Sequence, residues 1–257
     1  MTHMYDGLGK VLVIIPTYNE MLTLPDTLDA VLERIPQVHI LVVDDASPDG
    51  TGAYADEVAS RDERVFVMHR AAKDGLGAAY LAGFEWGLAR DYAVVCEMDA
   101  DGSHRATDLQ VILDELAAHP RAALVLGSRW VPQGKVVNWP KHREVLSRGG
   151  NTYVRVLLGL GLQDATGGFR AYRAQVLRDI DFSTIQSHGY CFQVDMARSV
   201  IKAGGEIREV PIVFVERTAG ESKMSGSIVR EALVKVTLWG IEKRFYQLKG
   251  LVTKKTG

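Results

Sequence analysis

The sequence predicts an α/β protein built on a mostly parallel, doubly wound sheet of the Rossmann-like type. Over the first 130 residues, short apolar runs of strand length alternate with segments whose apolar residues recur at helical spacing. The runs are apolar almost throughout, which is typical of strands covered on both faces. At 257 residues, 47% of them apolar, the chain can also bury a large core. Ligands of such sheets bind beyond the carboxyl ends of the strands, so the residues after each strand are the first candidates for function.

Five strands and four helices are expected in this part of the chain. The strands cover 10–15, 38–43, 65–69, 92–98 and 122–127. The helices between them cover 20–34, 49–60, 78–90 and 107–118. A dinucleotide-binding sheet needs glycines after its first strand, and the segment PTYNE that stands there has none. Gly75-Leu76-Gly77 comes too late to supply them and is interpreted as a turn before a helix.

The alternation of strands and helices ends after residue 127, where a stretch rich in Trp, Pro, Gly and Arg begins. Beyond it we expect helices over 144–160, 192–203 and 227–248, an ordered segment over 167–172, a strand over 207–215 and a polar loop over 216–226. No repeat, low-complexity tract or flexible linker separates these elements. We therefore predict a single domain with a C-terminal elaboration of helices and strands.

Charge is distributed unevenly along a chain whose formal net charge is only −2. Residues 1–120 contain 21 acidic and 8 basic residues, whereas residues 121–178 contain 10 basic and 2 acidic ones. This asymmetry suggests that an acidic part binds a metal ion and that basic segments meet an anionic ligand. The acidic half and the lack of a recognisable motif argue against a nucleic-acid partner.

Cysteine usage and hydropathy predict a cytoplasmic protein. Cys96 and Cys191 show no spacing typical of a metal site or a disulfide framework, which favours a reducing compartment. The N-terminus lacks the pattern of a signal peptide, and no run of about 18 apolar residues occurs.

Polar residues with binding potential follow the first two expected strands. Tyr18 offers a flat ring on which a base can stack, and Glu20 offers an acceptor for ring or ribose donors. Asp44 and Asp45 point to opposite sides as they leave a buried strand. One of the two carboxylates can cap the next helix while the other reaches a base edge or a ribose hydroxyl.

The fourth expected strand ends in the most informative segment, Asp99-Ala100-Asp101. Two carboxylates in this spacing can turn toward one point, where Mg²⁺ or Mn²⁺ takes oxygen ligands and keeps positions open for phosphate oxygens. His104 is either a further ligand or an orienting residue.

Cationic residues cluster after position 120. Arg129 follows the fifth strand, Arg143, Arg148 and Arg155 lie in the next helical segment, and the polar loop contains Arg217 and Lys223. Arginine suits bidentate contact with phosphate, and lysine acts as a point charge. Together they predict a surface that handles phosphate groups.

These segments together resemble the inverting family 2 glycosyltransferases of the GT-A fold, and within them the enzymes that mannosylate polyprenyl phosphates. The resemblance rests on VIIPTYNE, VVDDASPDGT, EMDADGSH, GSRWVPQG, ATGGFRAYR, GYCFQVDM and VPIVFVERTAGESKMSG. It implies transfer of mannose from GDP-mannose to a dolichyl-type polyprenyl monophosphate, giving a β-mannosyl phosphopolyprenol and GDP. A related transferase that uses another nucleotide sugar, such as UDP-glucose, is the alternative. Residues 1–130 would then bind the nucleotide sugar and the metal, and residues 131–257 the acceptor and the membrane.

The resemblance also implies roles for individual residues. Guanosine would be held by Pro16, Tyr18, Glu20, Val43 and Asp45. The donor would meet Asp99, Ala100 and Asp101, with Asp101 and Ser103 on Mg²⁺ or Mn²⁺ and Asp99 assisting. Catalysis would depend on Asp99, Asp101, Arg129, Arg217 and Lys223, the last three of which would also contact the donor. The acceptor phosphate would be bound by Arg129, Ser147 and Arg148.

A lipid acceptor requires contact with a membrane, and two helical stripes are candidates for it. One consists of Leu146, Tyr153, Val154, Leu157 and Leu160, with Arg148 and Arg155 among them. The other, on the terminal helix, consists of Val229, Leu233, Val236 and Trp239 beside basic residues. The first stripe either lies in the membrane interface or packs against the core, and the second either lies in the interface or contacts a membrane partner. We accordingly expect a peripheral protein on the cytosolic face of the membrane.

Overall fold

The computed structural model describes residues 7–187, 189–216 and 226–253. Its centre is a seven-stranded sheet with the order β3-β2-β1-β4-β7-β5-β8. These strands are β1 (Val11–Thr17), β2 (His39–Asp44), β3 (Val65–His69), β4 (Val94–Glu97), β5 (Ala122–Ser128), β7 (Arg170–Arg173) and β8 (Glu206–Pro211). All neighbours pair in parallel except β7, which runs antiparallel to both β4 and β5. The prediction of an α/β fold with a mostly parallel sheet is confirmed.

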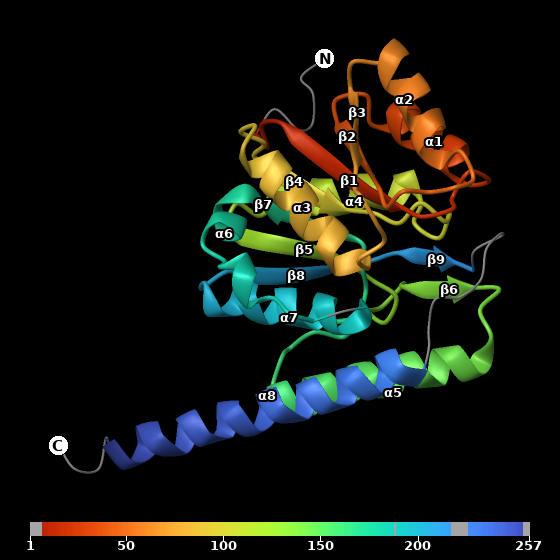
Figure 1. The fold of residues 1–257 in the computed structure, drawn as a ribbon. Coiled ribbons are helices and arrows are strands. Elements are labelled where there is room, and N and C mark those ends of the chain that lie inside the picture. Colours follow the sequence, from red (N-terminus) through yellow and green to blue (C-terminus); the bar gives the residue numbers. More distant parts are fainter. Residues whose placement is uncertain (1–6, 188, 217–225, 254–257) are drawn as a thin grey trace.

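Helices cover both faces of the sheet (Figure 1). They are α1 (Leu24–Arg34), α2 (Thr51–Arg61), α3 (Leu76–Leu88), α4 (Ala106–Ala118), α5 (Lys141–Leu158), α6 (Ala174–Arg178), α7 (Gly189–Lys202) and α8 (Gly226–Thr253), with a 3₁₀ turn at Phe182–Thr184. One buried cluster joins α1, α2 and α4 to the sheet, and a second joins α3, α6 and α7 to its other face. In β1, Val13 belongs to the first cluster and Leu12 and Ile14 to the second, which explains why the strand is apolar throughout.

Helices α5 and α8 form a further layer beneath α7 (Figure 1). A third buried cluster, which includes Val154 of α5, Val194 of α7 and Val236 of α8, holds the three helices together. Tyr153 Oη lies 2.6 Å from Thr237 Oγ1, and Lys243 Nζ donates to the Leu158 carbonyl oxygen. Since the residue numbers of these contacts rise together on both helices, α5 and α8 run in the same direction. None of the described helices combines the length and apolar character needed to cross a membrane.

The strand expected over 207–215 is interrupted at Ile212. Residues before it form β8, and those after it form β9 (Val213–Val215), which pairs in parallel with β6 (Lys135–Val137) in a separate two-stranded sheet. Ile212 connects the two sheets because its N–H donates to the Ser128 carbonyl and its own carbonyl accepts from the Lys135 N–H. The chain therefore passes the carboxyl end of β5, at the edge of the sheet where ligands are expected to bind.

Candidate active site

The carboxyl ends of β1, β2 and β4 lie next to one another because the three strands are adjacent and parallel. We call the loops that follow them, residues 16–23, 44–51 and 98–104, the acidic edge. The first two loops are joined by hydrogen bonds from the backbone N–H groups of residues 19, 20 and 21. Their acceptors are Ser47 Oγ, Thr51 Oγ1 and Asp49 Oδ2, at 3.0, 3.0 and 3.2 Å respectively. The expected base-binding segment around Tyr18 and Glu20 is thus held in place by the loop after β2.

Asp44 and Asp45 have separate partners, as their alternation along the strand predicts. Asp44 accepts from the Ser47 N–H and hydroxyl, at 3.0 and 2.6 Å, and from the Thr17 hydroxyl at 2.9 Å. It therefore shapes the turn. Asp45 is nearly buried and accepts from Arg70 Nη1 at 2.8 Å. Burial raises the pKa of Asp45, and Arg70 partly opposes this effect.

Tyr18 is half-buried, and the ammonium of Lys73 lies 3.9 Å from the centre of its ring. Val43 is fully buried within β2, so its side chain contributes to the core and only its backbone is near the strand end. Pro16 lies in β1 opposite Val43. The residues expected to hold guanosine are therefore brought together by the pairing of β1 with β2.

The loop after β4 brings Asp99 and Asp101 into one small cavity of about 70 Å³. Tyr80 Oη, fully buried on α3, donates to Asp99 Oδ1 at 3.2 Å. The Asp99 N–H donates to His104 Nδ1 at 3.0 Å, and the His104 ring stacks on Phe169. His104 is consequently an orienting residue in this geometry, since its Nδ1 is already an acceptor for the loop backbone.

The residues of this loop fit a divalent cation that shares its coordination with phosphate. Ser103 Oγ is buried and has no hydrogen-bond partner among the described residues, and the Ser103 N–H donates to Asp101 Oδ1 at 3.0 Å. Within the described ranges, no cluster of three or more His, Cys, Asp or Glu side chains is arranged to enclose a metal ion. Mg²⁺ typically binds through one or two carboxylates together with substrate phosphates, and Asp99, Asp101 and an unpartnered hydroxyl match that donor set.

A buried polar cluster lies at the end of β4, next to the loop that contains Asp99 and Asp101. Glu97 is fully buried and accepts from Gln193 Nε2 at 2.7 Å and from Tyr172 Oη at 3.1 Å. Burial raises the pKa of Glu97 to about 7, despite the neighbouring guanidinium of Arg170. Arg170 is itself fully buried and donates to the carbonyl oxygens of Ala165, Gly167 and Gln193. This cluster ties β4 and β7 to the turn that precedes β7.

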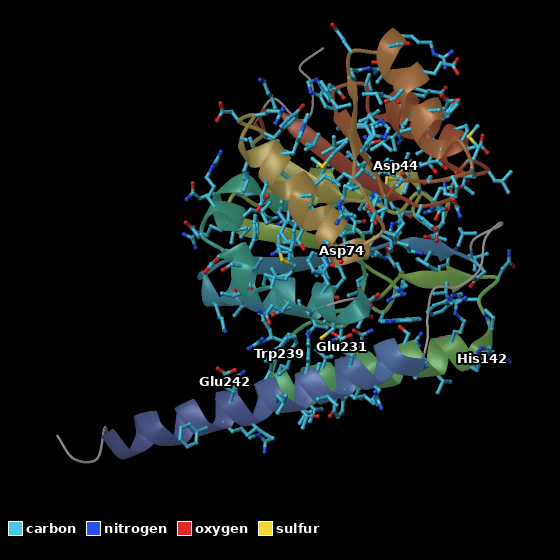
Figure 2. All side chains as sticks on the ribbon, in the orientation of Figure 1. Asp44, Asp74, His142, Glu231, Trp239 and Glu242 are labelled. Carbon is cyan, nitrogen blue, oxygen red and sulfur yellow. The ribbon has the colours of Figure 1, made fainter. Side chains whose placement is uncertain are left out.

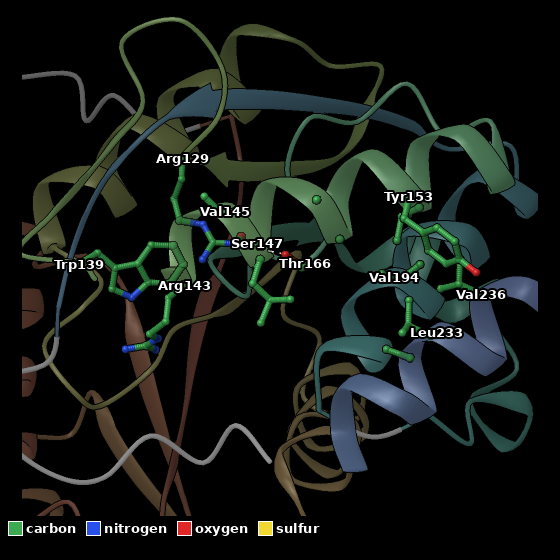
Figure 3. Close-up of a pocket in the computed structure, with 15 residues that line it drawn as sticks. Arg129, Trp139, Arg143, Val145, Ser147, Tyr153, Thr166, Val194, Leu233 and Val236 are labelled. Atoms are coloured by element: carbon green, nitrogen blue, oxygen red, sulfur yellow. Dashed lines mark hydrogen bonds between the residues drawn. The ribbon is translucent and has the colours of Figure 1, made fainter. Parts of the chain in front are cut away.

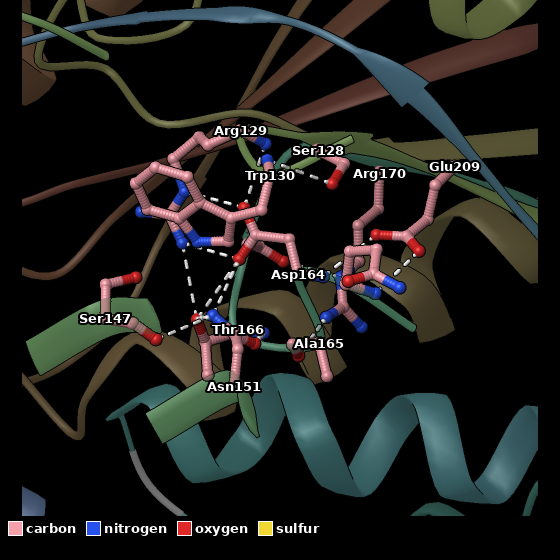
Figure 4. A network of polar contacts seen from close by, with 12 residues as sticks. Ser128, Arg129, Trp130, Ser147, Asn151, Asp164, Ala165, Thr166, Arg170 and Glu209 are labelled. Carbon is pink, nitrogen blue, oxygen red and sulfur yellow. Dashed lines mark hydrogen bonds and ion pairs between the residues drawn. The ribbon is translucent and has the colours of Figure 1, made fainter. Parts of the chain in front are cut away.

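Arg129 follows β5 and is fixed by a buried ion pair (Figure 4). Its Nε and Nη2 donate to the two carboxylate oxygens of Asp164 at 2.7 Å each. Asn151 of α5 donates from Nδ2 to Asp164 Oδ1 at 3.1 Å and to Thr166 Oγ1 at 3.0 Å. The backbone N–H of Asp164 in turn donates to Glu209 on β8. Burial alone would raise the pKa of Asp164, but Arg129 and Asn151 outweigh it and the pKa is lowered.

Aromatic rings separate the arginines near the start of α5. The guanidinium carbon of Arg129 lies 5.4 Å from the ring centres of Trp130, Trp139 and Phe214. The guanidinium carbon of Arg143 lies 5.2 Å from the Trp139 ring. Arg143 also pairs with Glu216, at 2.6 Å between Nη1 and Oε1. Cation–π contacts of this kind allow like charges to gather in a small volume.

A largely apolar groove of about 480 Å³ runs from these arginines along α5 (Figure 3). We call it the α5–α8 groove. Its lining residues are Arg129, Trp139, Arg143, Val145, Leu146, Ser147, Gly149, Gly150, Tyr153, Val154, Thr166, Val194, Ala232, Leu233 and Val236. Four of them, Arg129, Trp139, Arg143 and Thr166, also line the cavity that contains Asp99 and Asp101. The groove therefore meets the acidic edge at its guanidinium end.

The predicted phosphate-binding residues fall into three groups. Arg129 and Ser147 line the groove, and Ser147 Oγ is buried without a partner among the described residues. Arg148 instead is exposed, pairs with Glu144 at 2.8 Å and does not line the groove. Arg217 and Lys223 lie outside the described residues. Arg143, which the sequence did not distinguish from its neighbours, takes the position in the groove that was expected of Arg148.

Most of the apolar stripe predicted on α5 faces inward. Val154 and Leu160 are buried in the core, Tyr153 and Leu157 pack against it, and Leu146 lines the groove. Core packing, one of the two interpretations left open for this stripe, is therefore the correct one for all of them except Leu146, which is 44% exposed.

The stripe predicted on α8 faces inward as well. Val236 is buried, and Trp239 lies on the side of α8 toward α7 (Figure 2), where Arg198 stacks over its ring at 4.2 Å. Leu233 is half-exposed and lines the groove. The side chain of Val229 is outside the described part of the structure.

The outward face of α5 and α8 presents a different set of apolar residues. On α8, Val234, Leu238, Ile241 and Phe245 are 53–62% exposed and recur every three or four residues, so they share one side of the helix. On α5, Val145, which also borders the groove, and Val156 are 71% and 66% exposed and stand about three turns apart on one side. We call these six residues the outward stripe.

Comparison with known proteins defines the class to which the fold and site belong. A family model described as glycosyl transferase family 2 matches residues 12–181. Because this match spans more than half of the sequence, the chain belongs to glycosyl transferase family 2.

Two relatives are similar over nearly the whole chain. The polyprenol monophosphomannose synthase of Mycolicibacterium smegmatis is 57% identical over 244 residues, which are 95% of this chain and 91% of the relative. The undecaprenyl-phosphate mannosyltransferase of Micrococcus luteus is 55% identical over 240 residues, 93% of this chain and 98% of the relative.

Solved structures of lower identity share the fold. A glucosyl-3-phosphoglycerate synthase from Mycobacterium tuberculosis in complex with Mn²⁺, UDP-glucose and phosphoglyceric acid superposes with a TM-score of 0.68 at 18% identity. The match covers 92% of this chain and 81% of that one. The same enzyme with Mg²⁺ and UDP gives a TM-score of 0.66 at 17% identity, over 92% and 80% of the two chains.

Proposed function

We propose that this chain transfers mannose from GDP-mannose to a polyprenyl monophosphate, with inversion, giving a β-mannosyl phosphopolyprenol and GDP. One observation carries the proposal: the carboxylate cavity and the α5–α8 groove share Arg129, Trp139, Arg143 and Thr166. A nucleotide sugar at the first and a lipid phosphate in the second would meet at these residues. The names of the two close relatives supply mannose and a polyprenyl phosphate as the substrate classes.

The acceptor needs positioning more than activation. A phosphate monoester is already anionic near neutral pH, so one of its oxygens can attack the anomeric carbon without a strong general base. As that C–O bond forms, the bond from the anomeric carbon to the β-phosphate oxygen of GDP breaks, and GDP leaves with the electron pair. Arg143 and Ser147 would hold the acceptor phosphate beside Arg129. This positioning would accelerate the transfer because it aligns the attacking phosphate oxygen with the leaving GDP.

Charge on the departing diphosphate must be stabilised. Asp101 and Ser103, assisted by Asp99, would hold Mg²⁺ or Mn²⁺, which neutralises the charge of the leaving GDP when it is bound. Arg129, fixed by Asp164, would face the same charge from the side of β5. The resemblance adds Arg217 and Lys223 to this set. Base recognition is assigned to Pro16, Tyr18, Glu20, Val43 and Asp45 at the acidic edge.

A direct transfer assay tests this function. Purified protein is incubated with labelled GDP-mannose and C55 polyprenyl phosphate in detergent, with Mg²⁺, with Mn²⁺ or with EDTA. We expect label in the lipid fraction with either cation and none with EDTA. Parallel reactions contain UDP-glucose and GDP-glucose. Transfer from UDP-glucose but not from GDP-mannose would replace the proposal with the alternative donor, and transfer in EDTA would refute the role of the metal.

We further propose that the outward stripe places the protein on the cytosolic face of a membrane, with residues 131–257 as the acceptor-binding and membrane-facing part. The stripe lies on the two helices that form the groove, and basic side chains flank it, including the exposed Arg148 and Arg244. Amphipathic helices of this kind bind anionic lipid surfaces.

Vesicle flotation tests the membrane contact. We expect binding to vesicles with anionic phosphatidylglycerol to drop about tenfold in a Leu238→Ser, Ile241→Ser double variant, because each residue loses buried apolar surface. Val111→Ser, at an exposed position on α4, serves as the control and is expected to bind as the unmodified protein does. Equal flotation of the double variant would refute this membrane face.

A further inference from the structure

Two adjacent glycines, Gly149 and Gly150, stand in the interior of the 18-residue helix α5. Glycine is one of the least favourable residues at such a position because it gives up most backbone freedom. Neither glycine has the positive φ that would demand it. A Cβ atom built on either one meets no other atom within 4 Å. Neither the backbone conformation nor close packing therefore explains why this segment of the helix lacks side chains.

Gly240 on α8 shows what a packing glycine looks like in the same layer. A Cβ atom there would lie 3.3 Å from the Leu157 carbonyl oxygen and 3.4 Å from the Leu157 Cβ. The two helices thus touch at Gly240 and Leu157. Gly149 and Gly150 stand two turns earlier on α5, where the helices are separated by the groove that both glycines line. The pair of helices forms a wedge, closed at Leu157 and open at the glycines.

The glycines lie at a distinct position along the groove. Seven residues separate Arg143 from Gly150, which is about 10 Å along the helix axis. Ser147 stands between them, and the apolar side chains of Tyr153, Val154 and Val236 follow beyond. A phosphate held by Arg143 and Ser147 would therefore leave the hydrocarbon of the acceptor, rather than its headgroup, beside the glycines.

We propose that Gly149 and Gly150 determine acceptor specificity by keeping the wall of the groove open for the first isoprene units of the polyprenyl chain. This inference rests on the proposed function of the groove. It assigns these positions to recognition of the chain, whereas Arg129, Arg143 and Ser147 recognise the phosphate. A side chain on this stretch of α5 would occupy the channel without disturbing the fold.

Substitution with good helix formers separates this role from a structural one. Gly150→Ala and Gly150→Leu are expected to raise the melting temperature in the absence of lipid, because both residues favour the helix. Gly150→Leu is nonetheless expected to raise the KM for C55 polyprenyl phosphate at least tenfold, with a smaller increase for Gly150→Ala. The KM for GDP-mannose should stay within twofold of the unmodified value. A short competitor without an isoprene unit, methyl phosphate, occupies only the guanidinium end, and its inhibition constant should not change.

Thr152→Leu is the control, since it places a leucine side chain two residues further along the same helix, on its exposed side and outside the groove. It should leave the KM for the C55 acceptor within twofold. Three results would overturn the inference: an unchanged acceptor KM in Gly150→Leu, an equal increase in Thr152→Leu, or an equally weakened short competitor. Failure of the unmodified protein to transfer mannose to the C55 acceptor would instead refute the proposed function.

Discussion

In the loop after β2 the buried carboxylates are satisfied by partners within the protein, whereas several polar atoms at the guanidinium end of the α5–α8 groove are not. Asp44 accepts three hydrogen bonds and Asp45 is paired with Arg70. In the other region, among the described residues, Trp139 Nε1, Arg143 Nε and Ser147 Oγ are buried without a partner. Each such atom costs about 1–3 kcal/mol, so native proteins keep few of them. The contrast suggests that the nucleotide side is built in advance and that the acceptor side is completed by an anion.

The largest expected effect concerns the acidic edge. Replacing Asp101 by Asn keeps an oxygen for the Ser103 N–H but removes the charge that would hold the cation. We expect kcat to fall by about 10³-fold or more, since a metal supplies several kcal/mol of transition-state stabilisation. Transfer assays with Mg²⁺, together with Mn²⁺ binding by calorimetry, provide the measurement. An Asp101→Asn protein that retains full activity and binds the metal would contradict the metal-binding role proposed for the acidic edge.

The buried ion pair of Arg129 and Asp164 should contribute far more to stability than an exposed one. Asp164→Asn leaves the guanidinium without its counter-charge, and we expect a loss of about 3 kcal/mol in the free energy of unfolding. Glu144→Gln removes the exposed partner of Arg148 and should cost less than about 1 kcal/mol. Because folding lowers the pKa of Asp164, the ionised carboxylate stabilises the folded state fully at neutral pH. This stabilisation is lost as the pH falls through the folded-state pKa of Asp164. Urea denaturation at pH 7 measures both variants, and equal losses would contradict the assignment.

Glu97 predicts a pH dependence of the opposite sign. Its pKa rises from 4.5 to about 7 on folding, so between these values the folded protein holds a proton that the unfolded chain has released. Stability should therefore decrease as the pH rises from about 4.5 through about 7, by up to roughly 3 kcal/mol. Glu97→Gln should flatten this part of the profile. The measurement is urea denaturation at pH 5 and pH 8 in EDTA, because a cation at Asp99 and Asp101 favours the ionised form. Parallel profiles for both proteins would refute the prediction.

The smallest effect distinguishes two arginines of α5. Arg143→Ala should raise the KM for the C55 acceptor about 30-fold, corresponding to about 2 kcal/mol for a lost charge-assisted contact with phosphate. Arg148→Ala should change it less than twofold, because Arg148 is exposed, is paired with Glu144 and stands outside the groove. Steady-state kinetics at saturating GDP-mannose provide both values. A larger increase in the acceptor KM for Arg148→Ala than for Arg143→Ala would instead support the sequence-based prediction that Arg148 binds the acceptor phosphate.

The α/β core was predictable because its strands are apolar on both faces and long enough to be recognised without their partners. The pair β6 and β9 was not, since three-residue strands are defined by the partner they find, and the break at Ile212 depends on Ser128 and Lys135. Helix α6 was missed for its short length. Expected helix boundaries were off by up to five residues, as at α8, which ends at Thr253 where residue 248 was expected.

The acids of the site were predictable because a parallel sheet brings its strand ends together, whatever else the chain does. The residues on the acceptor side of the site were harder to predict from the sequence. Arg143 and Arg148 are separated by about 140° around α5, and only the packing of α5 against α7 and α8 decides which of them faces the groove. The same dependence on packing left two interpretations open for the apolar stripe of α5 and made the one for α8 wrong, since Val236 lies in the core. Asp164 and Asn151 carried no signal in the sequence, because their role comes from contact with Arg129 across 35 residues and with each other across 13.

The antiparallel strand β7 has a consequence for the order in which the molecule is assembled. It separates β4 from β5, so these two strands never pair with each other, and both neighbours of β5 come from residues beyond 169. During synthesis, β5 remains without a neighbour in the sheet until β7 and β8 have been made. Arg129 cannot reach its final position beside Asp101 before that point. The loop after β4 also waits for the second half of the chain, because His104 stacks on Phe169 and Glu97 accepts from Tyr172 and Gln193. Both sides of the proposed transfer site are therefore completed only when that second half has entered the sheet.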